Sequence, residues 1–271
     1  MNNKKLIIVR GGGDLATGSI HRLWSAGFSV VVLETDAPAA IRRQVSVCEA
    51  VYCRETVIEG MRAKLVDDIN DIEKVLSEGI VPVLIDPEGK SIEYLKPSVL
   101  VDAIMAKKNL GTNRNMAPVT IALGPGFNAG MDVDYVVETK RGHNLGRIIT
   151  EGAAAKNSGI PGNIGGYTSE RVMKSPAKGE FIAIKGIGDI VAAKEVIAQV
   201  KGEDGTIFDV KTEIPGILRG VLKSGYIVTE GFKVADVDPR IEELKNCFTI
   251  SDKARCIAGS VLEICVRACN E

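Results

Sequence analysis

The chain has few aromatic residues, almost no net charge and no long apolar run. Aromatic residues make up 4% of its 271 residues, and 34 Lys and Arg residues against 35 Asp and Glu residues leave a net charge of −1. The chain lacks the excess of basic residues that binding to nucleic acid or to an anionic membrane requires, so we expect neither as a partner. The first apolar run, at 6–9, is much shorter than a secretory or membrane-spanning segment. These absences predict a cytoplasmic protein.

The spacing of the cysteines argues against a zinc site and against a disulfide framework. The chain has 6 of them, but none forms a Cys-x-x-Cys pair or has a histidine close by in the sequence. This spacing is not typical of a zinc site or a disulfide framework, so we expect reduced thiols and no metal. Apolar residues make up 45% of the chain and charged residues 25%, as in globular proteins. The length then predicts one large domain or two ordinary ones.

Glycine is plentiful, with 29 residues, and its first cluster lies between two apolar runs. Residues 5–10 and 28–34 are predicted to be buried strands, joined by a helix that begins near Leu15. A glycine turn before a helix exposes backbone N–H groups at the positive end of the helix dipole, where phosphate binds. The predicted cofactor-binding residues here are Gly11, Gly12, Gly13, Asp14, Ala16 and, as the acceptor for ribose hydroxyls, Glu34.

Strands and helices continue to alternate after this unit. Helices are expected at 68–77 and 102–108, and strands at 63–66, 81–86, 99–101, 119–123 and 135–138. This alternation favours a Rossmann-like, mostly parallel α/β sheet over residues 1–166. Gly, Asn and Pro predominate between 141 and 166, and so long a stretch is expected to be functional or a hinge.

An internal repeat occupies residues 172–237. Five residues of the first copy recur 37 positions later: Gly179, Gly188, Ile190, Val191 and Val200 return as Gly216, Gly225, Ile227, Val228 and Val237. This spacing predicts a second domain over 167–271, a small barrel of two similar halves followed by a C-terminal helix. The repeat resembles the barrel-sandwich hybrid of lipoyl/biotinyl-carrier proteins, and the resemblance implies that fold for this domain. The connector at 201–206 lacks the Met-Lys-Met or Asp-Lys-Ala tip of a carrier, so we expect the scaffold without a covalent arm.

Two further glycine-containing loops complete the predicted site. The first follows an apolar strand, and its Gly124 and Gly126 are predicted to form an anion-binding nest. The second spans 138–147, where a pair of arginines would clamp a phosphate or carboxylate. Its candidate residues are Arg141 and Arg147 for binding and His143 and Glu138 for proton transfer. The expected cofactor is a nucleotide of the NAD(P) type or a molybdopterin-type ligand.

Eight short strings resemble the YqeB family of selenium-dependent molybdenum hydroxylase system proteins. They span most of the chain, at 10–18, 40–46, 101–107, 124–127, 138–143, 159–162, 236–240 and 250–254. The chain departs from the family pattern at Cys48 and Ile104. The resemblance implies an accessory role in the maturation of molybdenum hydroxylases, with such an enzyme as the client partner. The N-terminal turn is also similar to that of XdhC-type maturation factors, which handle molybdenum cofactor.

Three functions therefore stay open at the level of sequence. The leading one is a maturation factor that binds a nucleotide or a phosphorylated, pterin-type ligand. The first alternative is an NAD(P)-dependent oxidoreductase, with Glu34 on the adenosine ribose and His143 as acid or base. The second alternative is a non-catalytic adaptor that docks a client enzyme through the barrel.

Overall fold

The chain folds into two compact units in the computed structural model, which describes residues 6–156, 159 and 161–270. Unit 1 comprises residues 1–38, 46–157 and 250–271, and unit 2 comprises residues 39–45 and 158–249. Unit 2 is thus formed by two separate segments of the chain, and the C-terminal helix belongs to unit 1. The predicted division into 1–166 and 167–271 takes no account of this return, because local sequence patterns do not show which core a late segment joins.

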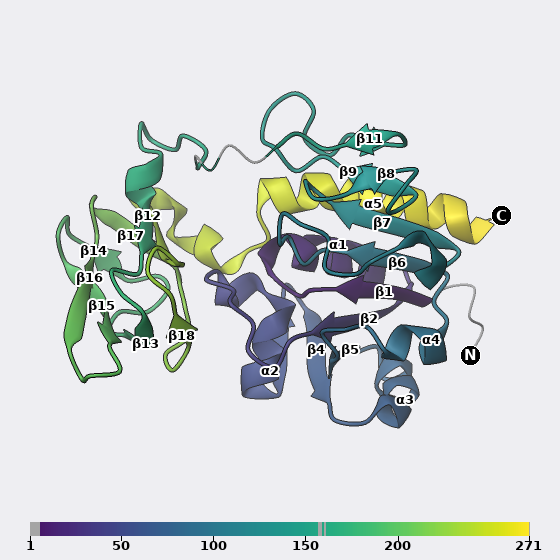
Figure 1. Cartoon of the computed structure of the whole chain (residues 1–271), viewed down its shortest axis with the longest axis horizontal. Coiled ribbons are helices and arrows are strands. Elements are labelled where there is room, and N and C mark those ends of the chain that lie inside the picture. Colours follow the sequence, from purple (N-terminus) through teal and green to yellow (C-terminus); the bar gives the residue numbers. More distant parts are fainter. Residues whose placement is uncertain (1–5, 157–158, 160, 271) are drawn as a thin grey trace. The chain divides into compact units, whose positions relative to one another are not determined.

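Unit 1 is built on a nine-stranded sheet in the order β10-β9-β7-β6-β1-β2-β5-β4-β3 (Figure 1). Its strands are β1 (Leu6–Arg10), β2 (Ser29–Glu34), β3 (Glu55–Ile58), β4 (Met61–Val66), β5 (Val81–Ile85), β6 (Val99–Asp102), β7 (Val119–Leu123), β9 (Tyr135–Val137) and β10 (Ile148–Ile149). The inner pairs are parallel, while β3–β4 and β9–β10 are antiparallel. The short strands β8 (Asn128–Ala129) and β11 (Gly152–Ala153) pair separately.

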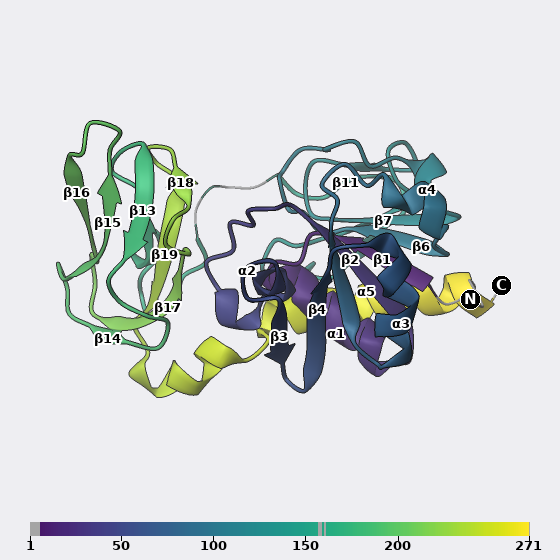
Figure 2. The same cartoon turned by 90° about the horizontal axis from the view of Figure 1, so that it is seen from below.

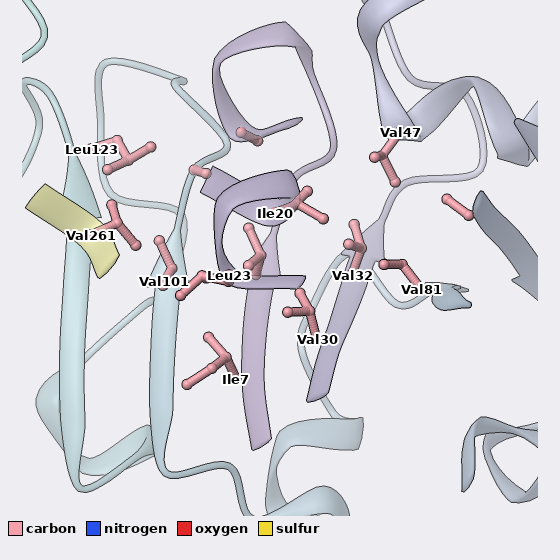
Figure 3. Close-up of a cluster of buried hydrophobic side chains, with 14 of the residues drawn as sticks. Ile7, Ile20, Leu23, Val30, Val32, Val47, Val81, Val101, Leu123 and Val261 are labelled. Atoms are coloured by element: carbon pink, nitrogen blue, oxygen red, sulfur yellow. The ribbon is translucent and has the colours of Figure 1, made fainter. Parts of the chain in front are cut away.

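The central strands are apolar throughout because both of their faces are buried. On β1, Ile7, which Figure 3 labels, and Val9 belong to one core, while Leu6 and Ile8 belong to the other. The first core is closed by α1 (Asp14–Ser25) and α5 (Asp252–Asn270), and the second by α3 (Ile72–Ser77) and α4 (Ser91–Leu95). A short helix, α2 (Ala50–Cys53), follows β2.

Helix α5 lies beside α1 on the same face of the sheet, as both views show (Figures 1 and 2). The close approach depends on Gly18 of α1, where an added Cβ would lie 2.8 Å from the backbone and Cβ of Ala254. Ile20 and Leu23 of α1 and Val261 of α5 then share the buried cluster drawn in Figure 3. The N-terminus of α5 is thereby fixed close to that of α1.

Unit 2 contains two four-stranded antiparallel sheets, β12-β19-β17-β14 and β16-β15-β13-β18. Its strands are β12 (Val172–Lys174), β13 (Gly179–Ala183), β14 (Ile190–Val191), β15 (Val196–Lys201), β16 (Ile207–Lys211), β17 (Gly216–Val221), β18 (Ile227–Val228) and β19 (Lys233–Asp238). Strands β17, β18 and β19 begin 37 residues after β13, β14 and β15. A 3-10 helix at Ile241–Phe248 follows.

The predicted fold class, a Rossmann-like sheet followed by a barrel-sandwich hybrid, was wrong, and the structure is an α/β fold with several sheets. Within the described residues, the connections from β6 to β7 and from β7 to β9 contain no α-helix, so the strand–helix alternation stops halfway. Both edges of the large sheet are antiparallel. In unit 2, no described strand pair joins the two sheets into a closed barrel.

The helix expected at 102–108 is also absent. Strand β6 ends at Asp102, and the following residues form a loop in which Met105 and Lys107 have φ values of 61° and 63°. Left-handed backbone at two non-glycine residues is incompatible with an α-helix. None of the described helices is both long and apolar enough to cross a membrane, and the cytoplasmic location stays a prediction.

Candidate functional site

Four loops meet at one edge of the large sheet. Strands β1, β6, β7 and β9 are parallel neighbours, so the loops that follow them leave from the same edge. Glycines let these loops touch: a Cβ on Gly124 would lie 2.5 Å from the Thr139 Oγ1 atom, and one on Gly126 would lie 2.7 Å from the Lys108 nitrogen. Both glycines also have φ values above 70°. We call the loops at 11–14, 103–108, 124–127 and 138–147 the edge loops.

The loop at 103–108 is held in a costly conformation. Left-handed φ values at Met105 and Lys107 each cost free energy, and such residues cluster at functional sites. The loop is anchored by Asp102, whose Oδ1 atom accepts a hydrogen bond from the Ile104 N–H at 3.2 Å. Gly11 packs closely against the first residue of this loop, since a Cβ added to Gly11 would lie 3.0 Å from the Ala103 carbonyl oxygen.

A buried polar network supports this anchor. The Arg10 Nη1 atom donates to the Thr112 hydroxyl at 2.6 Å, and that hydroxyl donates to the Asp102 Oδ2 atom at 2.6 Å. Arg10 also donates to the Pro87 carbonyl at 2.8 Å. All three side chains of the network are buried. Burial raises the pKa of Asp102, while the Thr112 hydroxyl, the Ile104 N–H and the charge of Arg10 oppose that rise.

The N-terminal glycine loop is tied to protein groups. The Gly12 N–H donates to the Glu34 Oε2 atom at 2.7 Å, and the Gly12 carbonyl accepts from the Cys48 N–H at 2.9 Å. Burial raises the pKa of Glu34, against hydrogen bonds from the Thr35 and Gly12 N–H groups. Asp14 places its carboxylate in the first turn of α1, where phosphate would otherwise interact with the helix dipole. This arrangement disfavours phosphate at Gly12.

The other predicted residues of this loop differ in exposure. Gly13 is half-buried, and a Cβ added to it would meet nothing within 4 Å. Ala16 is 1% exposed and packs into the core, so it does not face a ligand. Of the predicted N-terminal cofactor residues, Gly13, Asp14 and Glu34 are half-buried, whereas Gly11, Gly12 and Ala16 are buried.

The loop at 138–147 is fixed by Glu138, which is buried. Its two carboxylate oxygens accept hydrogen bonds from the Lys140 N–H at 2.7 Å and the Ala155 N–H at 2.8 Å. Arg141 donates two hydrogen bonds to Asp252 at the start of α5. His143 and Arg147 are exposed. The predicted pair of arginines is thus unequal, because Arg141 already has a carboxylate partner.

Lys253 is a residue of this edge that sequence reasoning missed. It is the second residue of α5 and is half-buried. Burial lowers its pKa, and the charge of Arg141 lowers it further, against the opposing charges of Asp14, Glu138 and Asp252. Among the described residues, the Lys253 ammonium has no hydrogen bond or ion pair. The string at 250–254, which resembles the YqeB family, includes Lys253, but nothing in the sequence indicated that this segment would lie near the glycine loop at 11–14.

In the described part of the chain, no group of three or more His, Cys, Asp or Glu side chains is arranged so that it could hold a metal ion. The polar side chains at this edge carry amine, guanidinium and carboxylate groups. An amine can bind an anion, accept a proton or act as a nucleophile, while carboxylates can transfer protons.

The chain is 45% identical to a protein of Escherichia coli (strain K12) described as uncharacterized protein YqeB, over 259 residues. The alignment covers 96% of this chain and 47% of that protein, so the chain spans about half the length of this curated relative. The match supports membership of the YqeB family, and that description assigns no activity. No protein-family model matches the chain.

The solved structures that resemble this chain are described as aspartoacylase-family, desuccinylase and ectoine utilization proteins. An aspartoacylase family protein of Mesorhizobium loti has a TM-score of 0.26 and 13% identity, with 82% of this chain and 60% of that chain covered. The ectoine utilization protein EutE of Ruegeria pomeroyi has a TM-score of 0.29 and 11% identity, with 85% of each chain covered. A succinylglutamate desuccinylase/aspartoacylase of Rhodobacter sphaeroides has a TM-score of 0.25 and 12% identity, with 81% and 62% covered.

These comparisons correct the functional prediction. The structural neighbours are aspartoacylase-like proteins, and they do not support a molybdenum hydroxylase maturation factor or a Rossmann nucleotide-binding protein. We therefore withdraw both interpretations, together with the oxidoreductase and adaptor alternatives that depended on the same fold. At these TM-scores the neighbours do not indicate a hydrolase activity either.

Proposed function

We propose, starting from the YqeB family membership that the 45% identity supports, that unit 1 binds a small anionic molecule at its edge loops. The observation that carries this proposal is the Lys253 ammonium, which is half-buried and has no partner among the described residues. A half-buried cation without a partner has lost part of its hydration, and an anionic ligand would replace what it lost.

The charges around Lys253 support an anion as the ligand. On the loop at 138–147, Lys140, Arg141, His143 and Arg147 are exposed, whereas its one acid, Glu138, is buried and satisfied by two N–H groups. The N-terminus of α5 adds the positive end of a helix dipole. Asp14 and Asp252 oppose this field, so the ligand is expected to be small and to carry one or two charges.

A binding measurement on the full chain tests the proposal. We expect pyruvate, lactate or another small carboxylate to bind the wild type in ligand-observed NMR. Lys253→Met should weaken binding about tenfold to a hundredfold, because a charge-assisted hydrogen bond is worth about 1.5–3 kcal/mol. Lys96→Met is the matched control, since Lys96 is exposed and lies just before β6, at the opposite edge. Equal affinity of the two variants, or no binding by the wild type, would contradict the proposal.

The ligand and the partner protein that the sequence predicts differ from the small anion proposed for Lys253. A molybdopterin-type or nucleotide ligand, and a molybdenum hydroxylase client, stay predictions from sequence. Including a nucleotide in the same NMR panel tests the first of them. Binding of the nucleotide with full dependence on Glu34 would favour the ribose-acceptor role predicted for that residue over its observed role as an acceptor for Gly12.

A further inference from the structure

Unit 2 exposes four large apolar side chains close to one another. Ile241, Leu244 and Phe248 lie on the 3-10 helix that follows β19, and Ile190 begins β14. Each of the four is between 39% and 57% exposed. We call these four residues the unit 2 patch. Apolar side chains gathered on one surface mark a site where another surface binds, whereas single exposed ones are common.

The patch is continuous across two segments of the chain. A Cβ on Gly188 would lie 3.2 Å from the Phe248 Cζ atom and 3.7 Å from the Leu244 Cδ1 atom, so the helix packs on the loop that leads into β14. Ile190 follows two residues after Gly188, and β14 is the last strand of its sheet. Ile241 and Leu244 are three residues apart, the spacing that aligns side chains on a 3-10 helix. The four side chains therefore form one surface.

The helix that carries most of the patch is held in place from its other side. Cys247, which lies between the exposed residues, is buried. Arg42 is also buried, and its Nη2 atom donates to the Asn246 carbonyl at 3.1 Å and to the Thr249 carbonyl at 3.2 Å. All of these residues belong to unit 2. Because the patch is already ordered, this chain gives up little conformational freedom when a partner binds there.

Charged side chains around the patch favour a partner with basic residues. Asp189 and Glu242 are exposed, and each is next in the chain to a residue of the patch. Arg240 is paired with Asp238 at 2.8 Å, which balances its charge. Lys245 is exposed on the same helix and offsets one of the acids. The rim thus has a small excess of negative charge, which lysine or arginine on a partner would complement.

The length of the Escherichia coli relative indicates what could cover the patch. The alignment covers 96% of this chain but only 47% of that protein. Unit 2 is therefore part of the match, and the relative has a further region of about the same length on the same polypeptide. The shared polypeptide keeps such a region at a high effective concentration beside unit 2, so that even a weak apolar contact is formed.

We propose that the unit 2 patch docks this further region of the longer YqeB-family chains, either on the same polypeptide or as a separate one. The occupant is a protein surface with apolar side chains for Leu244 and Phe248 and basic side chains for Asp189 and Glu242. It is a region of the family's own chains and not a client enzyme. The inference concerns unit 2 and does not depend on the anion site proposed for unit 1.

Hydroxyl-radical footprinting of two intact proteins tests the inference. The radical oxidises accessible side chains, and mass spectrometry locates the modified peptides. In this chain, the peptide containing 241–248 should be oxidised as fast as exposed side chains are. In the intact E. coli relative, the aligned peptide should be oxidised at least about fivefold more slowly, after correction for its composition, because a docked apolar surface excludes water. The internal control is the peptide with Ile207, which is exposed on β16 of the other sheet and should react equally in both proteins.

A charge placed in the patch should reverse the protection. Ile241→Asp in this chain is expected to leave the fold intact, because Ile241 is the most exposed residue of the patch. In the relative, aspartate at the position aligned with Ile241 should weaken docking about tenfold to a hundredfold, since a charge would be buried against an apolar surface. The aligned peptide should then be oxidised as fast as in this chain. Aspartate at the position aligned with Ile207 is the matched control and should leave the protection unchanged.

Each other occupant of the patch gives a result that overturns the proposal. Slow oxidation of 241–248 in this chain as a monomer would mean that another part of the same chain covers the patch. Slow oxidation in a dimer that Ile241→Asp dissociates in sedimentation velocity would assign the patch to a second copy. Equal oxidation of this chain and the relative would show that the patch stays open in both. None of these results affects the anion site, which carboxylate binding measures separately.

Discussion

Arg141 and Asp252 form a bidentate salt bridge, with Nη1 2.8 Å from Oδ2 and Nη2 2.9 Å from Oδ1. Their side chains are 46% and 74% exposed. The bridge joins the loop after β9 to the first residue of α5, and Lys253 comes next in the chain. It therefore connects a loop predicted as a site with a helix that the sequence assigned to another domain.

Breaking this bridge should affect binding more than stability. An exposed pair contributes about 0.2–1 kcal/mol to folding, so Asp252→Asn is expected to lower the free energy of unfolding by at most that amount. The same change releases Arg141 and should alter the affinity for a small carboxylate. Urea denaturation and ligand-observed NMR measure the two effects. Arg54→Gln, which breaks the equally exposed Arg54–Asp67 pair, is the control and should leave affinity unchanged.

The stability of the protein should respond differently to the same substitution at two neighbouring glycines. A Cβ on Gly12 would lie 2.8 Å from the Cys48 nitrogen, so Gly12→Ala must displace backbone, and we expect a loss of about 1–3 kcal/mol. Gly13 has an ordinary φ of −66° and open space for a Cβ. Gly13→Ala should therefore change stability by less than about 0.5 kcal/mol. Thermal unfolding of both variants is the measurement, and equal losses would contradict the packing of Cys48 against Gly12.

The hydroxyl of Thr112 should be essential to the buried network. Thr112→Val keeps the shape but leaves Arg10 and Asp102 each without a buried partner, and we expect a loss of about 1–3 kcal/mol or more. Thr112→Ser retains the hydroxyl and should recover much of that loss. Chemical denaturation compares the two variants. A valine variant as stable as the serine variant would show that the network does not stabilise the loop.

Acid should weaken the attachment of α5 through Glu59. Burial raises the pKa of Glu59, but hydrogen bonds from the Ile250 N–H and Arg255, with the charges of Arg255 and His21, outweigh it, and the net pKa is lowered. A lowered pKa in the folded state adds stability above the pKa of the unfolded state, and this stability is lost as the pH falls through the folded value. Glu59→Gln should therefore destabilise at neutral pH and flatten the acid limb of the stability curve. Parallel curves for variant and wild type would refute this.

Individual strands could be predicted from the sequence, because runs of consecutive apolar residues indicate strands that are buried on both faces. The expected strands at 5–10, 28–34 and 119–123 correspond to β1, β2 and β7. The 37-residue spacing of the repeat recurs in the strands of unit 2, from β13 to β19. Local hydrophobic pattern and glycine spacing are sufficient for features of this kind.

Other features followed from contacts between distant residues. The loop at 103–108 has helical composition, but Asp102 and Gly126 hold it in left-handed backbone that no local pattern predicts. The pairing of unit 2 into two sheets depends on which strand edges meet, and the same strands could close into a barrel without any change in pattern.

The sequence by itself determined the central strands, the repeat and the glycine loops, since each of these arises from interactions between near neighbours. Only the tertiary structure decided that α5 returns to pack on α1 through Gly18, which brings Lys253 within range of the charges of Asp14 and Glu138. The reason is physical: an apolar helix face can be buried against any apolar surface of the right shape, so its partner is set by the packing of the whole core.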